Sequence, residues 1–234
     1  MSEPVYDGIT PEALFLLAEN KFRDSKAFYE ENKAALNRLV VNPLRQIAGA
    51  MTGQLFALDA QMALDPVRMV SRIRRDTRFT KEKHFYRSNL WINFRRQSEE
   101  FQPCPYMWFE IRPEEDDWSC GVCVIYASPA YMRFFHERLL AAPEPFLAAV
   151  ARAQSAGAQS EITAYKKDHC PDAPENLKPW LNAKGFCIIY RKPGLGVLQD
   201  DSILAALGEQ YAAFAEMYRW LCASAEEYIS DGAA

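Results

Sequence analysis

The chain has 234 residues, of which 49% are hydrophobic and 25% charged, a composition typical of a globular protein large enough to bury its own core. Its net charge of -4 argues against a general nucleic-acid coat protein, because binding to the phosphate backbone depends on clustered cations. No uncharged stretch approaches the roughly 20 apolar residues that cross a bilayer, and the N-terminus lacks the basic and apolar regions of a secretory signal. We therefore expect a cytoplasmic protein with no membrane association.

The N-terminal part of the chain is predicted to be helical. Thr10 followed by proline is typical of a helix start, and apolar residues at helical spacing predict a helix over residues 11–19. A second helical pattern begins after Ser25 and continues to about residue 55. Pro43 should break or kink this second helix, because proline cannot donate the backbone hydrogen bond that the helix interior requires.

The middle of the chain changes to an alternation with period two, which is typical of half-buried strands. Strands are predicted at residues 67–74, 90–95, 107–111 and 122–126. The polar link from Arg112 to Ser119 is short and resembles a hairpin turn. These strands therefore predict a largely antiparallel meander.

The C-terminal part returns mainly to helical spacing. Helices are predicted after Ser128, again after Pro143, over residues 175–184 with Gly185 as the C-terminal cap, and from Asp200 onward, with a strand at 186–190. An order of helices, strands, helices, strand and helix indicates an α+β fold, here a largely antiparallel sheet flanked by N-terminal and C-terminal helices. No linker or repeat divides the chain, so we expect one domain over residues 1–234.

The charge distribution singles out one segment. Residues 71–90 carry a net charge of +5, which leaves the rest of the chain at -9. The seven cations of this segment are Arg72, Arg74, Arg75, Arg78, Lys81, Lys83 and Arg87, and its two anions are Asp76 and Glu82. A basic patch on an acidic body is the electrostatic feature that a functional interpretation must explain.

The same segment resembles the signature of a family found in bacteria and fungi, the domain of unknown function 2461. The matching positions are Arg72, Arg75, Asp76, Arg78, Phe79, Lys81, Lys83 and Tyr86. The similarity extends to residues 14–20 and 28–33, Pro43, and the pair Lys166 and Lys167. Arg74, His84 and Phe85 depart from the pattern and affect the expected loop shape. The family is uncharacterised, so the resemblance implies no particular reaction.

The cations lead to three interpretations. Residues two apart in a strand lie about 6.6 Å from each other on one face, so two arginines there repel by about 0.6 kcal/mol in water and about 2.5 kcal/mol at an effective dielectric constant near 20. Arginines that lie on one face of a strand and are shielded from water therefore require a negatively charged partner. This partner is either a set of internal acidic side chains, in a structural ion-pair network, or a small anionic ligand such as phosphate. Nucleic acid is a third, disfavoured partner, because the patch is short. The candidate ligand-binding residues are Arg72, Arg75, Asp76, Arg78, Lys81, Lys83, Tyr86 and Arg87.

Three other residue patterns are of types that can carry chemistry. Cys120 and Cys123 form a C-x-x-C, but residues three apart in a strand point to opposite faces, so we expect reduced packing thiols rather than a metal or dithiol site. His84 lies among cations without an identifiable nucleophile or carboxylate partner. The acidic run 114–117 is interpreted as a solvated hairpin tip. No phosphate-binding glycine loop or metalloprotease motif occurs, and we expect no metal, no cofactor and no catalytic residue.

Overall fold

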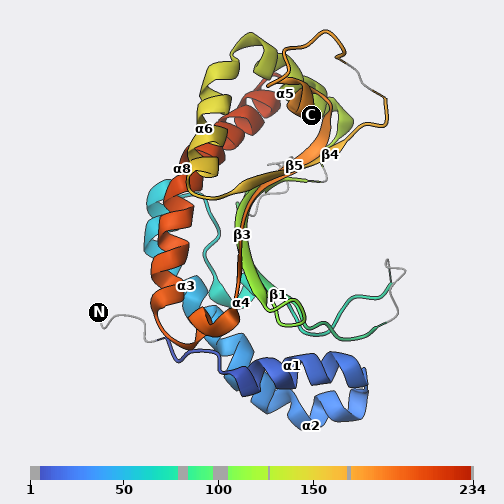
Figure 1. Ribbon diagram of the computed structural model, residues 1–234, viewed down its shortest axis with the longest axis vertical. Helices are drawn as coiled ribbons and strands as arrows, with labels where there is room; N and C mark the ends of the chain where they lie inside the picture. Colours follow the sequence, from blue (N-terminus) through green and yellow to red (C-terminus); the bar gives the residue numbers. More distant parts are fainter. Residues whose placement is uncertain (1–5, 79–83, 97–104, 126, 168–169, 233–234) are drawn as a thin grey trace.

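The computed structural model of the protein describes residues 6–78, 84–96, 105–125, 127–167 and 170–232. A curved five-stranded antiparallel sheet lies at its centre, with the strand order β1-β2-β3-β5-β4 (Figure 1). The strands are β1 (Leu90–Phe94), β2 (Tyr106–Arg112), β3 (Asp117–Val124), β4 (Gln159–Ala164) and β5 (Ala183–Pro193). The predicted α+β class is confirmed.

Helices cover one face of the sheet and extend beyond its β1 end (Figure 1). They are α1 (Pro11–Arg23), α2 (Lys26–Leu36), the π-helix η1 (Asn37–Val41), α3 (Asn42–Leu58), α4 (Pro66–Met69), α5 (Pro129–Ala141), α6 (Pro143–Ser155), α7 (Lys178–Leu181), the 3-10 helix η2 (Leu195–Gln199) and α8 (Ser202–Ser230). The long helix α8 contacts β2 and β3, and α3 contacts β1. The hairpin of α1 and α2 lies beside the β1 end of the sheet (Figure 1). No helix in the described part of the chain is long and apolar enough to span a membrane.

Alternation along each strand gives the sheet two different faces. In β1, Leu90, Ile92 and Phe94 are fully buried against the helices, whereas Trp91 and Asn93 are half-buried on the opposite, outer face. The main hydrophobic core thus fills the space between the sheet and the helices. A second, smaller apolar cluster lies on the outer face and consists of Trp108, Cys123 and Ile189, with Tyr106, Ile125 and Cys187 packed against it.

The outer face also carries a half-buried carboxylate. Glu110 lies opposite Trp91 in the pairing of β1 with β2, and the side-chain amide of Asn89 donates a 2.7 Å hydrogen bond to it. Burial raises the pKa of Glu110, although the hydrogen bond from Asn89 opposes this shift. This carboxylate is therefore protonated more readily in the folded protein than in the unfolded chain.

Helix starts follow the predicted capping residues. The side chains of Thr10, Ser25 and Ser128 accept hydrogen bonds from backbone N–H groups in the first turns of α1, α2 and α5. Pro43 lies in the first turn of α3, directly after the π-helical turn η1. The helical path therefore continues past proline by widening locally, because the wider turn accommodates the missing donor without ending the helix.

Several sequence predictions were wrong in detail. The segment 67–74 was expected to be a strand, but Asp65 caps the short helix α4 and only isolated bridges follow it. Strand β4 was not predicted, because its exposed residues show no apolar alternation. Gly185 was expected to cap a helix, but it lies inside β5, where a Cβ atom would meet the carbonyl oxygen of Val124 at 2.8 Å. The single-domain interpretation stays a prediction.

The cysteines show one clear departure from the prediction. Cys123 and Cys187 are directly opposite each other in β3 and β5 and are joined by a disulfide, so the expectation of a reduced thiol is wrong for Cys123. Cys120 faces the main core instead, where burial raises the pKa of its thiol. The two residues of the C-x-x-C therefore point to opposite faces, as the strand geometry predicted.

A buried ion-pair network fixes the end of β1 to the helices. The guanidinium of Arg96 donates to Asp59 at 2.7 Å and to Glu226 of α8 at 2.6 Å. The hydroxyl of Tyr218 donates to the same Asp59 carboxylate at 2.8 Å. Burial alone would raise the pKa of Asp59, but the hydrogen bond from Arg96 and further bonds lower it overall. The network thus links α3, β1 and α8 through one carboxylate.

Candidate functional site

The basic segment forms an irregular extension along the outer edge of β1, and we call residues 70–78 the basic ridge. Its backbone pairs with the residues that lead into and form β1. Ser71 N donates to Trp91 O at 2.8 Å, and Arg75 N donates to Phe85 O at 2.8 Å. Arg87 N donates to the carbonyl of the ridge residue Ile73 at 3.1 Å. These backbone hydrogen bonds hold the ridge arginines in a defined place beside the sheet.

The α1–α2 hairpin holds the other side of this region. The carboxylate of Asp24, at the C-terminal end of α1, accepts hydrogen bonds from the backbone N–H groups of Phe85 at 2.7 Å and Tyr86 at 3.1 Å. The ring of Tyr86 is stacked on Tyr29 of α2, with 4.7 Å between their centroids. The α1–α2 hairpin is thus joined to the ridge through Phe85 and Tyr86, which precede β1 in the chain.

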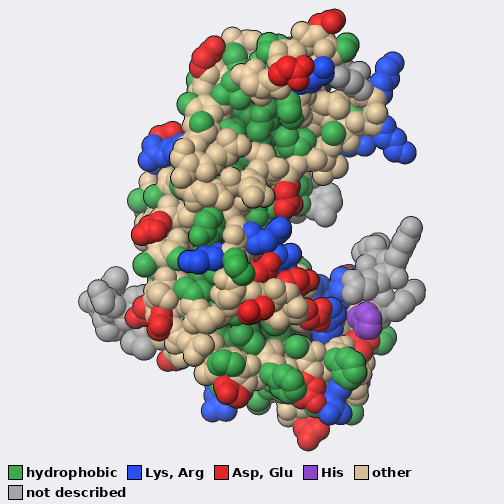
Figure 2. All heavy atoms as spheres, viewed as in Figure 1, with side chains coloured by type: hydrophobic (Ala, Val, Ile, Leu, Met, Phe, Trp, Pro, Cys, Tyr) green, Lys and Arg blue, Asp and Glu red, His purple; other side chains and the backbone are tan. Residues whose placement is uncertain are grey.

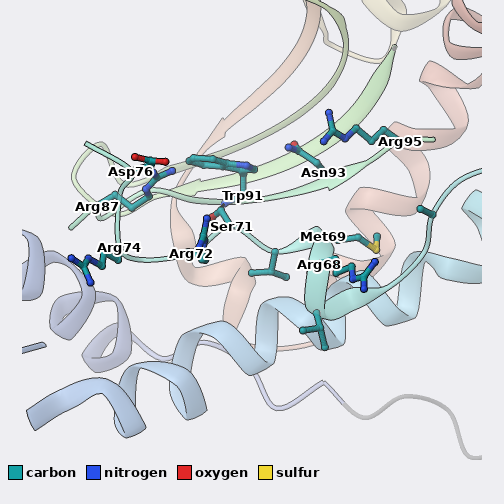
Figure 3. Close-up of a pocket in the computed structure, with 13 residues that line it drawn as sticks. Arg68, Met69, Ser71, Arg72, Arg74, Asp76, Arg87, Trp91, Asn93 and Arg95 are labelled. Atoms are coloured by element: carbon teal, nitrogen blue, oxygen red, sulfur yellow. Dashed lines mark hydrogen bonds between the residues drawn. The ribbon is translucent and has the colours of Figure 1, made fainter. Parts of the chain in front are cut away.

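Two pockets lie on either side of the basic ridge. The sheet-side pocket has a volume of about 450 Å³ and lies between α4, the ridge and β1 (Figure 3). It is lined by Ala63, Val67, Arg68, Met69, Val70, Ser71, Arg72, Arg74, Asp76, Arg87, Trp91, Asn93 and Arg95. Five arginines therefore face this pocket together with one carboxylate, that of Asp76.

The helix-side pocket has a volume of about 610 Å³ and lies between the ridge and the helices α2 and α3. Its charged lining residues are Glu30, Lys33, Arg45, Arg72, Arg74, Arg75, Asp76 and Arg78. Arg72, Arg74 and Asp76 line both pockets. In Figure 3, Arg72 lies below Trp91, whereas Arg74 extends toward the helices.

Ion pairs compensate only part of this positive charge. The guanidinium of Arg78 binds the carboxylate of Asp76 at 2.6 Å, and this hydrogen-bonded contact lowers the pKa of Asp76. Lys33 pairs with Glu30 at 3.5 Å, at the rim of the helix-side pocket. The structural ion-pair interpretation therefore applies to at least part of the set.

Four arginines at the two pockets have no acidic partner in the described part of the protein. These residues are Arg45, Arg72, Arg74 and Arg95, which have no carboxylate oxygen within 4.0 Å among the residues that the structure describes. The Nε atom of Arg45 is also buried without a hydrogen-bond partner. Figure 2 shows Lys and Arg side chains bordering the recess of the molecule, with acidic side chains among them. Positive charge thus remains available to a ligand at both pockets.

Aromatic side chains line both pockets. Trp91 projects from the outer face of β1 into the sheet-side pocket, and the guanidinium carbon of Arg87 lies 4.5 Å from its ring centroid. Tyr29 lies in the wall of the helix-side pocket, with the ammonium group of Lys33 at 5.8 Å from its ring centroid. Both rings are therefore neighbours of cations, where a ligand could contact an aromatic face and a positive charge together.

The structure brings most of the predicted site residues together. Arg72, Arg75, Asp76, Arg78 and Arg87 each line at least one pocket. Lys81 and Lys83 lie outside the described residues. Tyr86 is only 3% exposed and lines neither pocket, because its ring is packed against Tyr29.

Two other sequence interpretations have a different setting in the structure. Lys166 and Lys167 follow β4, at the opposite edge of the sheet from β1, and line neither pocket. No carboxylate partner of His84 is identifiable in the sequence, but in the structure its Nδ1 lies 3.5 Å from the Asp24 carboxylate. Sequence reasoning missed this contact because the two residues come from distant parts of the chain.

Sequence reasoning also missed several pocket residues. They are Lys33, Arg45, Arg68, Trp91, Asn93 and Arg95. The sequence pattern could have identified three of them, because alternate positions of a strand lie on one face of a sheet. Trp91, Asn93 and Arg95 occupy such positions in the strand predicted at 90–95, at the end of the basic segment. Lys33 and Arg45 carried no such signal, because only the packing of α2 and α3 brings them to the ridge.

Comparison with known proteins gives one match. A family model described as "Conserved hypothetical protein (DUF2461)" matches residues 12–220. No curated protein and no solved structure matches the chain. The matched region includes the basic ridge, both pockets and all five strands.

Proposed function

The chain belongs to the conserved hypothetical protein family DUF2461, and we propose that it is an anion-binding protein whose ligand carries phosphate. The binding site consists of the basic ridge and the two pockets beside it. The ligand-binding residues are Arg72, Arg74, Arg75 and Arg87, together with Arg45 and Arg95 from α3 and the end of β1. From the residues expected from the sequence this proposal keeps Arg72, Arg75 and Arg87, and it adds Arg45, Arg74 and Arg95, which line the same pockets.

The observation that carries the proposal is that, among the described residues, no carboxylate oxygen lies within 4.0 Å of the guanidinium nitrogens of Arg72 or Arg74. Asp76 is the nearest acidic residue along the ridge, but its carboxylate is bound by Arg78. Arg72 and Arg74 face two pockets instead of an internal partner within 4.0 Å among the described residues. Cations that are held close together repel each other, and an anion that binds between them removes this repulsion.

Arginine is well suited to bind phosphate. Its planar guanidinium offers several N–H donors in a fixed arrangement, which matches the oxygens of a phosphate group in a bidentate manner. The pockets have volumes of about 450 and 610 Å³, within the range of about 300 to 1,000 Å³ that is usual for small-molecule sites. A phosphate-bearing small molecule therefore fits both the chemistry and the size of the site.

Two alternatives remain from the sequence. The pair of Arg78 with Asp76 favours a structural role for that arginine, but it leaves Arg72 and Arg74 unexplained. Nucleic acid stays disfavoured, because the net charge of the protein is -4 and the basic ridge is short. A cytoplasmic location is proposed with the function, and the Cys123–Cys187 disulfide is the observation against it, because disulfides are rare in cytosolic proteins.

The experiment is a thermal-shift measurement with inorganic phosphate, nucleotides and sugar phosphates. A ligand at 100 times its Kd stabilises the folded protein by about 2.7 kcal/mol, which corresponds to a rise in Tm of roughly 5–10 °C for a chain of this size. We expect at least one of these anions to raise the Tm of the wild-type protein, and the variant Arg72→Gln, Arg74→Gln to lose most of this shift.

A matched control removes two positive charges elsewhere. Arg133 of α5 and Arg219 of α8 are exposed, and neither has a carboxylate within 4.0 Å among the described residues. The variant Arg133→Gln, Arg219→Gln should retain the ligand-dependent shift of the wild-type protein. If no anion stabilises the wild-type protein, or if both double variants lose the shift equally, the anion-binding proposal is wrong.

A further inference from the structure

The two pockets are not independent, because they share the basic ridge as a common wall. The residues that line both are Val67, Val70, Ser71, Arg72, Arg74 and Asp76. On the basis of the proposed anion-binding function, we infer that the ligand is a small polyanion with at least two linked phosphate groups, one in the sheet-side pocket and one in the helix-side pocket.

Each pocket has cations that the other lacks. Arg68, Arg87 and Arg95 line only the sheet-side pocket, and Lys33, Arg45, Arg75 and Arg78 line only the helix-side pocket. Arg95 and Arg45, one on each side, have no carboxylate within 4.0 Å in the described part of the chain. A single phosphate in one pocket leaves the arginine of the other pocket uncompensated. Two linked phosphates, one in each pocket, would compensate both, and Arg72 and Arg74 line both pockets.

The carboxylate of Asp76 favours two separate anionic positions over one central position. Asp76 lines both pockets from the ridge, and its negative charge is held in place by hydrogen bonds from Arg78 at 2.6 and 2.9 Å. A single phosphate placed directly over the ridge would be repelled by this carboxylate and would lie away from the cations that line only one pocket, whereas a linked anion meets this repulsion only where its linkage crosses the ridge. Anionic groups on either side of the ridge can keep away from it while remaining close to the arginines.

The walls of the pockets suit the uncharged part of such a ligand. Trp91 and Asn93 offer an aromatic surface and a side-chain amide in the sheet-side pocket (Figure 3). Tyr29 offers an aromatic ring in the helix-side pocket. An aromatic base or sugar attached to the phosphates could contact these groups. Linked phosphates occur in small molecules and in nucleic acids, and the overall charge of -4 favours the small molecule.

The test compares binding of three probes by isothermal titration calorimetry: inorganic phosphate, tripolyphosphate and a short single-stranded oligothymidylate. For the wild-type protein we expect tripolyphosphate to bind at least tenfold more tightly than inorganic phosphate. A tighter complex with the oligothymidylate, with an affinity that falls steeply with salt, would instead assign the site to nucleic acid and overturn the small-ligand inference.

Variants specific to each pocket decide whether both are used. We expect Arg95→Gln and Arg45→Gln each to weaken tripolyphosphate binding about tenfold, the loss expected when one charge-assisted hydrogen bond is removed. Arg133→Gln serves as the control and should leave the affinity unchanged. Because part of Arg45 is buried, Lys33→Gln provides a second, more exposed probe of the helix-side pocket.

The outcomes separate this inference from the proposed function. If tripolyphosphate binding depends on Arg72 and on the residues of one pocket only, the two-pocket inference is wrong and the anion-binding function stands. If inorganic phosphate and tripolyphosphate bind equally well, the requirement for linked phosphates is also wrong. If none of the probes binds to the wild-type protein, the inference and the proposed function both fail.

Discussion

Asp24 and Tyr86 are separated by 62 positions in the sequence, yet the carboxylate of Asp24 accepts a 3.1 Å hydrogen bond from the backbone N–H of Tyr86. The same carboxylate accepts a second hydrogen bond from Phe85. Asp24 itself has a left-handed backbone conformation, with φ of 44°, at the end of α1. One side chain therefore connects the end of a helix to the segment that fixes the basic ridge.

Replacement of Asp24 tests this connection. Asp24→Ala removes the Oδ1 atom that accepts both hydrogen bonds and should lower the free energy of unfolding by about 1–3 kcal/mol, because two backbone donors lose their partner. Asp24→Asn should have a smaller effect, since asparagine tolerates the left-handed conformation and keeps one acceptor oxygen. Urea denaturation measures both variants, and Asp172→Ala, at an exposed position, is the control. Equal stability of Asp24→Ala and wild type would contradict this interpretation.

The buried network around Asp59 should dominate the stability of the β1 end. Asp59→Ala leaves the guanidinium of Arg96 without its buried partner, and the expected loss is about 3–5 kcal/mol. Chemical denaturation at pH 7 measures this loss against the exposed control Glu209→Gln. A loss below about 1 kcal/mol would show that Glu226 alone is sufficient to compensate Arg96.

The lowered pKa of Asp59 implies that the stability of the folded protein depends on pH. Because the pKa of Asp59 is lowered in the folded protein, its contribution to stability is present above the unfolded-state value of about 3.9. This contribution is lost as the pH falls through the lower folded-state pKa. The stability difference between wild type and Asp59→Asn should therefore decrease on acidification below about pH 4. Unfolding curves recorded from pH 7 to pH 3 check this, and a constant difference would refute it.

The raised pKa of Glu110 implies that its contribution to stability changes with pH in the opposite direction to that of Asp59. Its pKa is raised by burial, so the folded protein holds a proton more tightly than the unfolded chain, and this favourable contribution is lost as the pH rises above the unfolded-state value. Glu110→Gln should thus raise the Tm at pH 7 and have little effect at pH 4. Glutamine can still accept the hydrogen bond from Asn89. Glu209→Gln, at an exposed position of α8, should change neither value.

The Cys123–Cys187 disulfide gives a further prediction. It closes a loop with a sequence separation of 64 residues, and removing such a bond destabilises a protein by about 2–4 kcal/mol. A reductant should therefore lower the midpoint of urea denaturation of the wild-type protein. The variant Cys123→Ser, Cys187→Ser should unfold at the lower midpoint with or without reductant. A wild-type midpoint that is insensitive to reductant would contradict the prediction.

The fold was predictable from the sequence where local chemistry decides the structure. Capping residues such as Thr10 and Ser128 marked helix starts correctly, because the side chain and the N–H groups it binds are only a few residues apart. The prediction was wrong at residues 67–69, where alternation suggested a strand but Asp65 and Pro66 start a helical turn. Strand β4 was missed because it pairs with β5 at an exposed edge, and no buried face imposes an apolar pattern on it.

The candidate site was predictable to the extent that its cations are neighbours in the sequence. Arg72, Arg75 and Arg87 were found through the charge contrast of one segment. Arg45 of α3 could not be predicted as a site residue from the sequence, because its position at the ridge depends on how the helices pack against the sheet. The disulfide between Cys123 and Cys187 was also missed, since the pairing of β3 with β5 cannot be read from the spacing of cysteines.

The placement of the basic ridge along β1 has a consequence for how the protein behaves at high concentration. The outer edge of a terminal strand offers unpaired backbone groups to the strands of other molecules, which promotes aggregation. Here the ridge occupies part of that edge through the bridge between Val70 and Ile92, and its arginines repel the same segment of a second copy. The charges proposed to attract a ligand thereby also oppose pairing between molecules at the β1 edge of the sheet.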